Sequence, residues 1–134
     1  MKTEVFSIRT GRAAAAVDVT ERVAAFVAGE GDGLVNVFVP HATAGVAVME
    51  VGAGSERDLL AALDAVLPAD DRWAHRHGTK GHGRDHVLPA FVAPSVVLPV
   101  VGGRLALGTW QAVVLVDTNG DNPDRQVRLT LLRG

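Results

Sequence analysis

The sequence predicts an α+β fold: a single domain, residues 1–134, with a large, mainly antiparallel β-sheet or sandwich and two to three helices. Three observations lead to this class. The chain has 134 residues, of which 48% are hydrophobic, and this suits one compact core with no room for a second domain. Its apolar residues switch between the period typical of strands and the longer period typical of helices. Strand-like segments follow one another after residue 94 instead of alternating with helices, which argues against βαβ units.

The first quarter of the chain predicts one strand and one helix. Residues Thr3–Arg9 alternate between polar and apolar side chains, as a half-buried strand does. From Asp18 to Val27 the apolar residues recur at helical spacing, behind Asp18 or Thr20 as a capping residue. The glycines of segment Gly29–Gly33 then end this short amphipathic helix.

The next segments predict two strands and a longer helix. Residues Leu34–Val39 and Val46–Val51 are rich in β-branched residues and flank a turn, so we expect them to pair as antiparallel strands. Ser55 begins a segment whose leucines and valines fall on one helical face, and Pro68 follows its end. This pattern predicts a helix over residues 55–67.

The second half of the chain predicts a long loop and then a β-meander. Residues Ala69–Asp85 are polar and glycine-rich, which favours a functional loop over regular structure. The segments that follow are apolar and are separated by turn residues. We expect strands at Ser95–Val101, Arg104–Leu107, Trp110–Asp117 and Gln126–Leu132.

Composition and charge exclude several classes of function. A net charge of −2 offers no general attraction for nucleic acid or for an anionic membrane. The absence of cysteine excludes disulfides, thiolate chemistry and cysteine-ligated zinc, so any metal site must use His, Asp and Glu. The first twelve residues lack the apolar core of a signal peptide, and no apolar run is as long as a membrane span. We therefore expect a soluble cytoplasmic protein.

Four of the five histidines lie within twelve residues, at positions 75, 77, 82 and 86. Histidine titrates near neutral pH and is the commonest metal ligand, so the cluster indicates proton transfer, metal binding or phosphate binding. His75 and His77 would project to one face of an extended segment, whereas His82 and His86 could chelate a metal if that segment were helical. The alternative is a solvated loop in which the histidines share no role.

The same loop carries three cations, Arg76, Lys80 and Arg84. Flexible cations among glycines suit a phosphate-bearing ligand, although the order of residues is not that of a P-loop. A solvated charged face is the alternative.

Other candidate residues lie at the ends of predicted strands. His41 and Thr43 follow one strand and Asp117 ends another, so they could meet at one edge of the sheet. Glu50 lies among apolar residues and would need a partner if it faced inward; otherwise it is an outward-facing strand residue.

Trp110 and Gln111 begin a predicted strand. Composition favours a core position for Trp110 and an ordinary strand position for Gln111, although the pair could also line a pocket for a flat heterocycle. Arg125, Arg128 and Arg133 are expected to face solvent.

The chain resembles the YjbQ-like family of secondary thiamine-phosphate synthases over nearly its full length. The resemblance lies in the turn His41-Ala42-Thr43-Ala44 and in a few further motifs. These motifs are Glu50, His75, His86, APSVVLPV, GRLALGTWQ and Asp117. The resemblance implies a compact α+β subunit that assembles as a homotrimer, with pockets near the subunit interfaces.

The resemblance also implies roles for individual residues. It implies a catalytic set comprising His41, Glu50, His86 and Asp117. We expect His41, His75 and His86 to hold a divalent metal, zinc or magnesium; the alternative for His41 and His86 is a role in proton transfer. The resemblance implies that Trp110 and Gln111 line the same pocket. Together with Thr43 and the loop cations Arg76, Lys80 and Arg84, which residue type alone suggests, they are the expected substrate-binding positions. His77 and His82 match no motif of the family, although His82 could replace a polar residue usual there.

Three departures from the family pattern bear on activity. Leu88 replaces a usual lysine, which removes a phosphate-binding cation, and Ala42 and Val51 replace polar residues. The resemblance implies a transferase that joins an aminopyrimidine diphosphate to a thiazole phosphate, or performs this as a side activity. Two alternatives remain, namely a metal-dependent hydrolase of a phosphorylated small molecule and a non-catalytic trimeric module that binds a metabolite or a metal.

Overall fold

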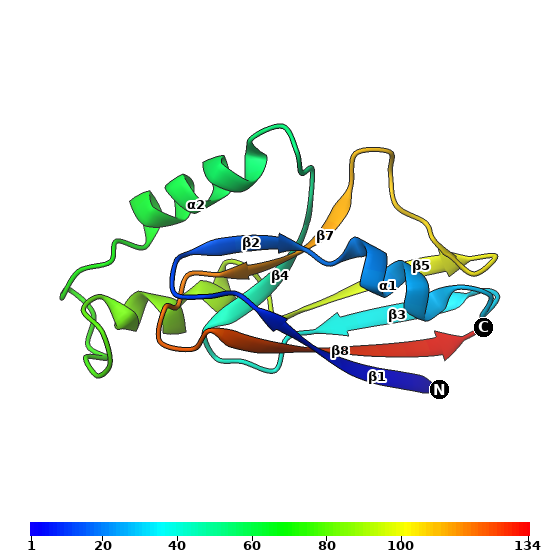
Figure 1. Ribbon diagram of the computed structural model, residues 1–134, viewed down its shortest axis with the longest axis horizontal. Coiled ribbons are helices and arrows are strands. Elements are labelled where there is room, and N and C mark those ends of the chain that lie inside the picture. The colour runs from blue at the N-terminus through cyan, green and yellow to red at the C-terminus, as the bar shows by residue number, and fades with distance from the viewer.

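The computed structural model describes residues 1–134 and confirms the predicted α+β class (Figure 1). Every paired strand is antiparallel to its neighbour. The elements in chain order are β1 (Lys2–Arg9), β2 (Ala15–Asp18), α1 (Thr20–Val27), β3 (Gly33–Phe38), β4 (Ala44–Met49), α2 (Ser55–Val66), the 3₁₀ helices η1 (His82–His86) and η2 (Leu88–Ala90), β5 (Ser95–Val101), β6 (Arg104–Leu105), β7 (Ala112–Asp117) and β8 (Asp124–Arg133).

The strands form two sheets packed face to face. One sheet has five strands in the order β1-β8-β3-β5-β6, and the other has three in the order β2-β7-β4. The larger hydrophobic core lies between them, because it joins Val35 and Leu129 of the first sheet to Val113 and Leu115 of the second. Helix α1 adds Phe26 to this core.

Strand β7 is buried along its whole length because both of its faces are covered. Alternate residues, such as Val113, face the five-stranded sheet, while Val114 and Val116 face a second core. Helix α2 contributes Leu63 to that second core and η2 contributes Leu88. The molecule therefore has three layers, with the three-stranded sheet in the middle and α2 outside it (Figure 1).

Two expectations about strand pairing were wrong. The predicted pair β3 and β4 does not form, because the chain after Phe38 crosses to the other sheet, where β4 pairs with β7. The C-terminal strands are also not a simple meander. Strands β5 and β6 form a hairpin, β7 joins the other sheet, and β8 returns to pair with both β1 and β3.

Strand β2 was absent from the expected elements, since its sequence begins with two alanines and lacks a strand-like pattern. Because β2 extends to Asp18, helix α1 starts at Thr20, whose backbone N–H donates to the Asp18 carboxylate at 2.9 Å. Neither α-helix reaches the length and apolar character that a membrane span requires.

Candidate metal centre

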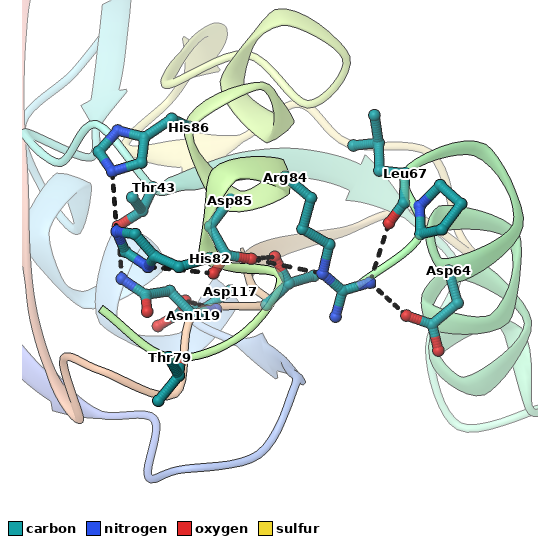
Figure 2. A network of polar contacts seen from close by, with 12 residues as sticks. Thr43, Asp64, Leu67, Thr79, His82, Arg84, Asp85, His86, Asp117 and Asn119 are labelled. Atoms are coloured by element: carbon teal, nitrogen blue, oxygen red, sulfur yellow. Dashed lines mark hydrogen bonds and ion pairs between the residues drawn. The ribbon is translucent and has the colours of Figure 1, made fainter. Parts of the chain in front are cut away.

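Four imidazole rings meet at one end of the molecule. They belong to His75, His77, His82 and His86, and one ligand atom from each lies within 4.8 Å of all the others. The ring centroids of His75 and His86 are 4.1 Å apart. The two Nε2 atoms of His82 and His86 approach to 2.9 Å (Figure 2).

Local chain geometry creates this convergence. Gly81 adopts a left-handed conformation, with φ of 79°, and starts η1, which carries His82 and His86. At Gly83 an added Cβ would lie 2.5 Å from the His75 carbonyl oxygen and would also collide with Trp73. Only glycine therefore allows η1 to pack against the segment that carries His75 and His77.

Two carboxylates lie near the Nδ1 atom of His82, a side chain that is 7% exposed. Its Nδ1 lies 3.0 Å from Oδ2 of Asp121 and 3.6 Å from Oδ2 of Asp85. Asp121 accepts hydrogen bonds from the backbone N–H and hydroxyl of Thr79, and the backbone bond does most to lower the pKa of Asp121. Burial raises the pKa of Asp85, whose Oδ1 accepts the Thr118 hydroxyl at 2.6 Å.

The histidines suit a metal better than a cluster of protonated rings. Burial, and then repulsion from neighbouring histidines, lower the pKa of His75 and of His86. Both rings are therefore neutral at pH 7 and offer lone pairs. The buried Nε2 of His75 has no hydrogen-bond partner, and neither has Nδ1 of His82, whose contact with Asp121 is close but poorly aligned. A cation bound among the rings would satisfy the orphaned His75 nitrogen.

The donor set indicates the kind of metal. Tetrahedral zinc has bonds of about 2.0–2.1 Å to histidine, which puts its nitrogens about 3.3 Å apart. The ligand nitrogens of the four histidines lie between 2.9 Å and 4.8 Å from one another, a range that includes the roughly 3.3 Å expected around zinc. Magnesium prefers oxygen ligands, so the four imidazoles fit zinc or a similar transition metal and do not fit magnesium.

A second polar group lies beside the cluster, buried at the end of β7. Arg125 and Asp117 are each 1% exposed and form a two-point ion pair, with distances of 2.7 and 3.0 Å. Asp117 also accepts hydrogen bonds from the Thr10 hydroxyl and from the Asn119 backbone. Thr43 accepts from both Arg125 and Asn119. The expectation that Arg125 faces solvent was wrong, because an arginine paired with a buried aspartate gives no signal in a local pattern.

His41 is outside the group of four histidines. Its Nε2 accepts a hydrogen bond from the Gln126 backbone at 2.9 Å, and burial together with the nearby Arg125 lowers its pKa. His41 therefore adjoins the buried ion pair, while His77 and His82 occupy places among the converging rings.

The remaining candidates lie at the opposite end of the middle sheet. In the ladder between β4 and β7, Ala44 faces Asp117 and Met49 faces Ala112. Glu50 follows Met49 directly, and Trp110 and Gln111 directly precede Ala112. The six residues of β4, with five steps between them, separate the two ends by roughly 17 Å.

Trp110 is 74% exposed, so the core position that composition favoured is wrong. Gln111 closes a turn in which its side chain accepts the Gly108 backbone N–H at 2.8 Å. Within this chain, neither residue lies beside the histidines.

The three cations of the loop have different surroundings. Arg84 is 8% exposed and binds the Asp64 carboxylate and the Leu67 carbonyl oxygen, so it ties η1 to the end of α2 (Figure 2). Arg76 and Lys80 are exposed. Both line a cavity of about 170 Å³ that also includes His75 and Thr79. Asp70 and Asp71 line the same cavity, so its wall carries charges of both signs.

Comparison with known proteins places the chain in a family. The family model described as UPF0047 protein YjbQ-like matches residues 4–134. The UPF0047 protein Rv2556c of Mycobacterium tuberculosis is 58% identical over 134 residues and covers all of both chains. The UPF0047 protein YugU of Bacillus subtilis is 31% identical over 123 residues, covering 87% of this chain and 89% of its own.

Solved structures agree with this placement. The crystal structure of hypothetical protein APE1520 from Aeropyrum pernix K1 has a TM-score of 0.90 and 34% identity, covering 100% of both chains. A YbjQ-like protein of unknown function from Sulfolobus solfataricus P2 has a TM-score of 0.90 and 26% identity, covering 99% of this chain and 97% of that one. The chain therefore belongs to the YjbQ-like UPF0047 family, which confirms the family that its motifs resemble.

Proposed function

We propose that this protein is a metal-dependent hydrolase of phosphorylated small molecules. His75, His77, His82 and His86 would hold a divalent transition metal such as zinc. The single observation that carries the proposal is the convergence of these four imidazoles, whose ligand atoms lie within 4.8 Å of one another. A metal bound here would supply Lewis-acid chemistry, polarising a phosphoryl oxygen or lowering the pKa of bound water.

The cavity beside the cluster supports a phosphorylated substrate. Hydrolysis of a phosphate ester adds water across the P–O bond and releases inorganic phosphate and an alcohol. Lys80 and Arg76 line the cavity and would balance the negative charge of the phosphoryl group. Of the two carboxylates at the same wall, Asp70 is already paired with Arg72, which leaves Asp71 to oppose them. Arg84, already paired with Asp64, would hold the loop in place instead of contacting substrate.

Thiamine-phosphate synthesis is a second candidate, and the family motifs favour it. This reaction needs a free carboxylate near the developing pyrimidine cation. Asp117 is already bound by Arg125, and Glu50 lies at the far end of β4. The synthase would therefore need Glu50 and Trp110 of a neighbouring copy beside the histidines, so hydrolysis is the better-supported reaction for one subunit.

A non-catalytic metal-binding module is the third candidate. Four imidazoles can complete the tetrahedral shell of zinc, and structural zinc sites are closed in this way, whereas catalytic sites keep an open position. For hydrolysis, one of the four histidines would have to leave the metal so that water or substrate can bind in its place. We propose His77 for this role, because it is exposed and lies on the loop outside η1.

We also propose that the protein assembles as a homotrimer. The outer face of the five-stranded sheet supports association between copies, because Leu34, Val97 and Leu132 are each about half exposed there. They line a hollow of about 480 Å³ together with Phe38. An exposed apolar patch of this kind is typical of a contact surface.

Metal analysis tests the centre itself. Tag-free protein is loaded with zinc, dialysed and analysed for metal content, as wild type and as the variants His82→Ala, His86→Ala and His41→Ala. We expect near-stoichiometric zinc in the wild type and in the His41→Ala control, and loss of zinc from the other two. Zinc retained by His82→Ala and His86→Ala would refute the centre.

Turnover separates the three candidate functions. The zinc-loaded wild type and His77→Ala are expected to release phosphate from p-nitrophenyl phosphate, whereas His86→Ala is inactive. Formation of thiamine phosphate from the aminopyrimidine diphosphate and the thiazole phosphate, lost in Glu50→Gln, would favour the synthase. Stoichiometric zinc without either reaction would leave the binding module.

A further inference from the structure

His82 differs from the other three histidines of the cluster in having a carboxylate directly behind it. Its Nε2 faces the Nε2 of His86 at 2.9 Å, and its Nδ1 faces Oδ2 of Asp121 at 3.0 Å. The ring is therefore held between the cluster on one side and an acidic group on the other. His82 is also the buried member of the four, so its ring has little room to turn.

Hydrogen bonds from Thr79 hold the Asp121 carboxylate in place. Its Oδ2 accepts hydrogen bonds from the Thr79 backbone N–H at 3.2 Å and from the Thr79 hydroxyl at 3.1 Å. The backbone N–H of Asp121 donates to the Asn119 side chain at 2.8 Å. A Cβ at Gly78 would lie only 2.6 Å from the same Oδ2, so glycine at position 78 makes room for this carboxylate.

We infer that Asp121 is a positioning residue that fixes the tautomer and direction of His82 for metal binding. Neutral imidazole has one N–H donor and one acceptor nitrogen. The Asp121 carboxylate lies 3.0 Å from Nδ1 without an aligned hydrogen bond, so it acts by its charge, which favours the proton on Nδ1 and leaves the Nε2 lone pair to point into the cluster. This inference rests on the metal centre proposed above and names the group that orients one of its ligands.

Asp85 is the competing carboxylate, and geometry favours Asp121. Asp85 lies farther from Nδ1, at 3.6 Å, and its other oxygen accepts the Thr118 hydroxyl. Asp121 comes from the loop between β7 and β8, far along the chain from the histidines. The orientation of His82 therefore depends on contact between two loops, and a change in either one would weaken metal binding.

Zinc affinity, measured by competition with a chromophoric chelator, tests the inference. Asp121→Asn keeps the size of the side chain and removes its charge. We expect zinc affinity to fall about 10–100-fold, the usual effect of losing such a supporting group. Asp124→Asn is the matched control, because it makes the same charge change three residues away, where the carboxylate faces Arg9 on the surface. This control should bind zinc as the wild type does.

A second measurement reports the tautomer directly. Nitrogen-15 NMR of the zinc-loaded wild type should show His82 protonated at Nδ1 and bound through Nε2. Should Asp121→Asn fail to fold, Thr79→Ala replaces it, since it removes one bond to the carboxylate and should cause a smaller loss of zinc affinity. A His82 ring bound through Nδ1 would overturn the inference.

The outcomes distinguish this inference from the proposed function. A wild type that binds no zinc overturns the metal centre and the role of Asp121 together. Equal zinc affinities for the wild type and Asp121→Asn, with weaker binding by His82→Ala, overturn the role of Asp121 and leave the centre intact. A lower melting temperature of Asp121→Asn with unchanged zinc affinity would likewise reduce Asp121 to a purely structural residue.

Discussion

Asp117, the last residue of β7, and Arg125 of β8 form a buried ion pair. Both side chains are 1% exposed, and the carboxylate is bound by Arg125, Thr10 and Asn119. Removing one partner leaves an uncompensated buried charge, which costs about 3–5 kcal/mol. We predict this loss of unfolding free energy for Arg125→Met in urea titrations.

The double variant Arg125→Met with Asp117→Leu is the control for that prediction. It removes both charges, so its stability should exceed that of Arg125→Met alone. A single variant as stable as the wild type would contradict the structural role of the pair.

His41 gives a prediction about pH. Its pKa is lowered by burial and by Arg125, against a smaller opposite effect of Asp117. Because the folded-state pKa lies below the unfolded value of about 6.5, the unfolded chain binds the proton more tightly. The contribution of His41 to stability is therefore fully present above about pH 6.5 and is lost as the pH falls toward the lowered folded-state pKa.

Protonation of Nε2 would also remove the acceptor that the Gln126 backbone N–H uses. We expect metal-free wild type to lose stability relative to His41→Gln as the pH falls below about 6.5 toward the lowered folded-state pKa of His41, as measured by urea unfolding. A constant difference between the two proteins across this range would show that His41 does not titrate differently in the folded state.

At the scale of elements, the path of the loop from Trp73 to His86 depends on a close approach at Gly83. An added methyl group would meet the His75 carbonyl oxygen at 2.5 Å and collide with Trp73, so η1 would have to move away from His75. We predict that Gly83→Ala lowers stability by about 1–3 kcal/mol, as overpacking does. It should also weaken zinc binding, as measured by chelator competition.

Gly108→Ala is the control for this prediction. There an added methyl group meets only the flexible Gln111 side chain, at 3.2 Å. Equal zinc affinities for Gly83→Ala and Gly108→Ala would mean that the packing of η1 does not determine the geometry of the centre.

The elements themselves were more predictable from the sequence than their partners. Alternation identified β1, and the leucine pattern identified α2, because both signals are local. The pairing of β4 with β7 depends on where the chain crosses between sheets, and no local pattern records that. Strand β2 was missed because alanine carries almost no strand signal.

The same distinction applies to the candidate site. Residue type pointed to the segment from His75 to His86, since clustered histidines are conspicuous in any sequence. The positions of His77 and His82 among the converging rings depend on loop geometry, and the contact of Asp121 with His82 joins segments far apart in the chain. Spacing in sequence could not predict either feature.

At the scale of the whole molecule, the two ends of the middle sheet hold different groups of candidate residues. The histidines and the buried ion pair lie at one end, while Glu50 and the exposed Trp110 lie at the other. A single chain keeps these groups apart, so a reaction that needs both would require contact between copies. The oligomeric state therefore bears directly on the choice between hydrolysis and thiamine-phosphate synthesis.

The exposed face of the five-stranded sheet provides the last prediction. Val97 is 54% exposed and lies among other apolar residues on this face, so a charge there would oppose the approach of another copy. We expect the wild type to sediment at three times the mass of one chain and Val97→Glu to sediment as a single chain. Val66→Glu is the matched control, because Val66 is 57% exposed but lies on α2, away from this face, and it should keep the trimer. A wild type of single-chain mass would refute the trimer, and loss of assembly in both variants would move the interface away from the five-stranded sheet.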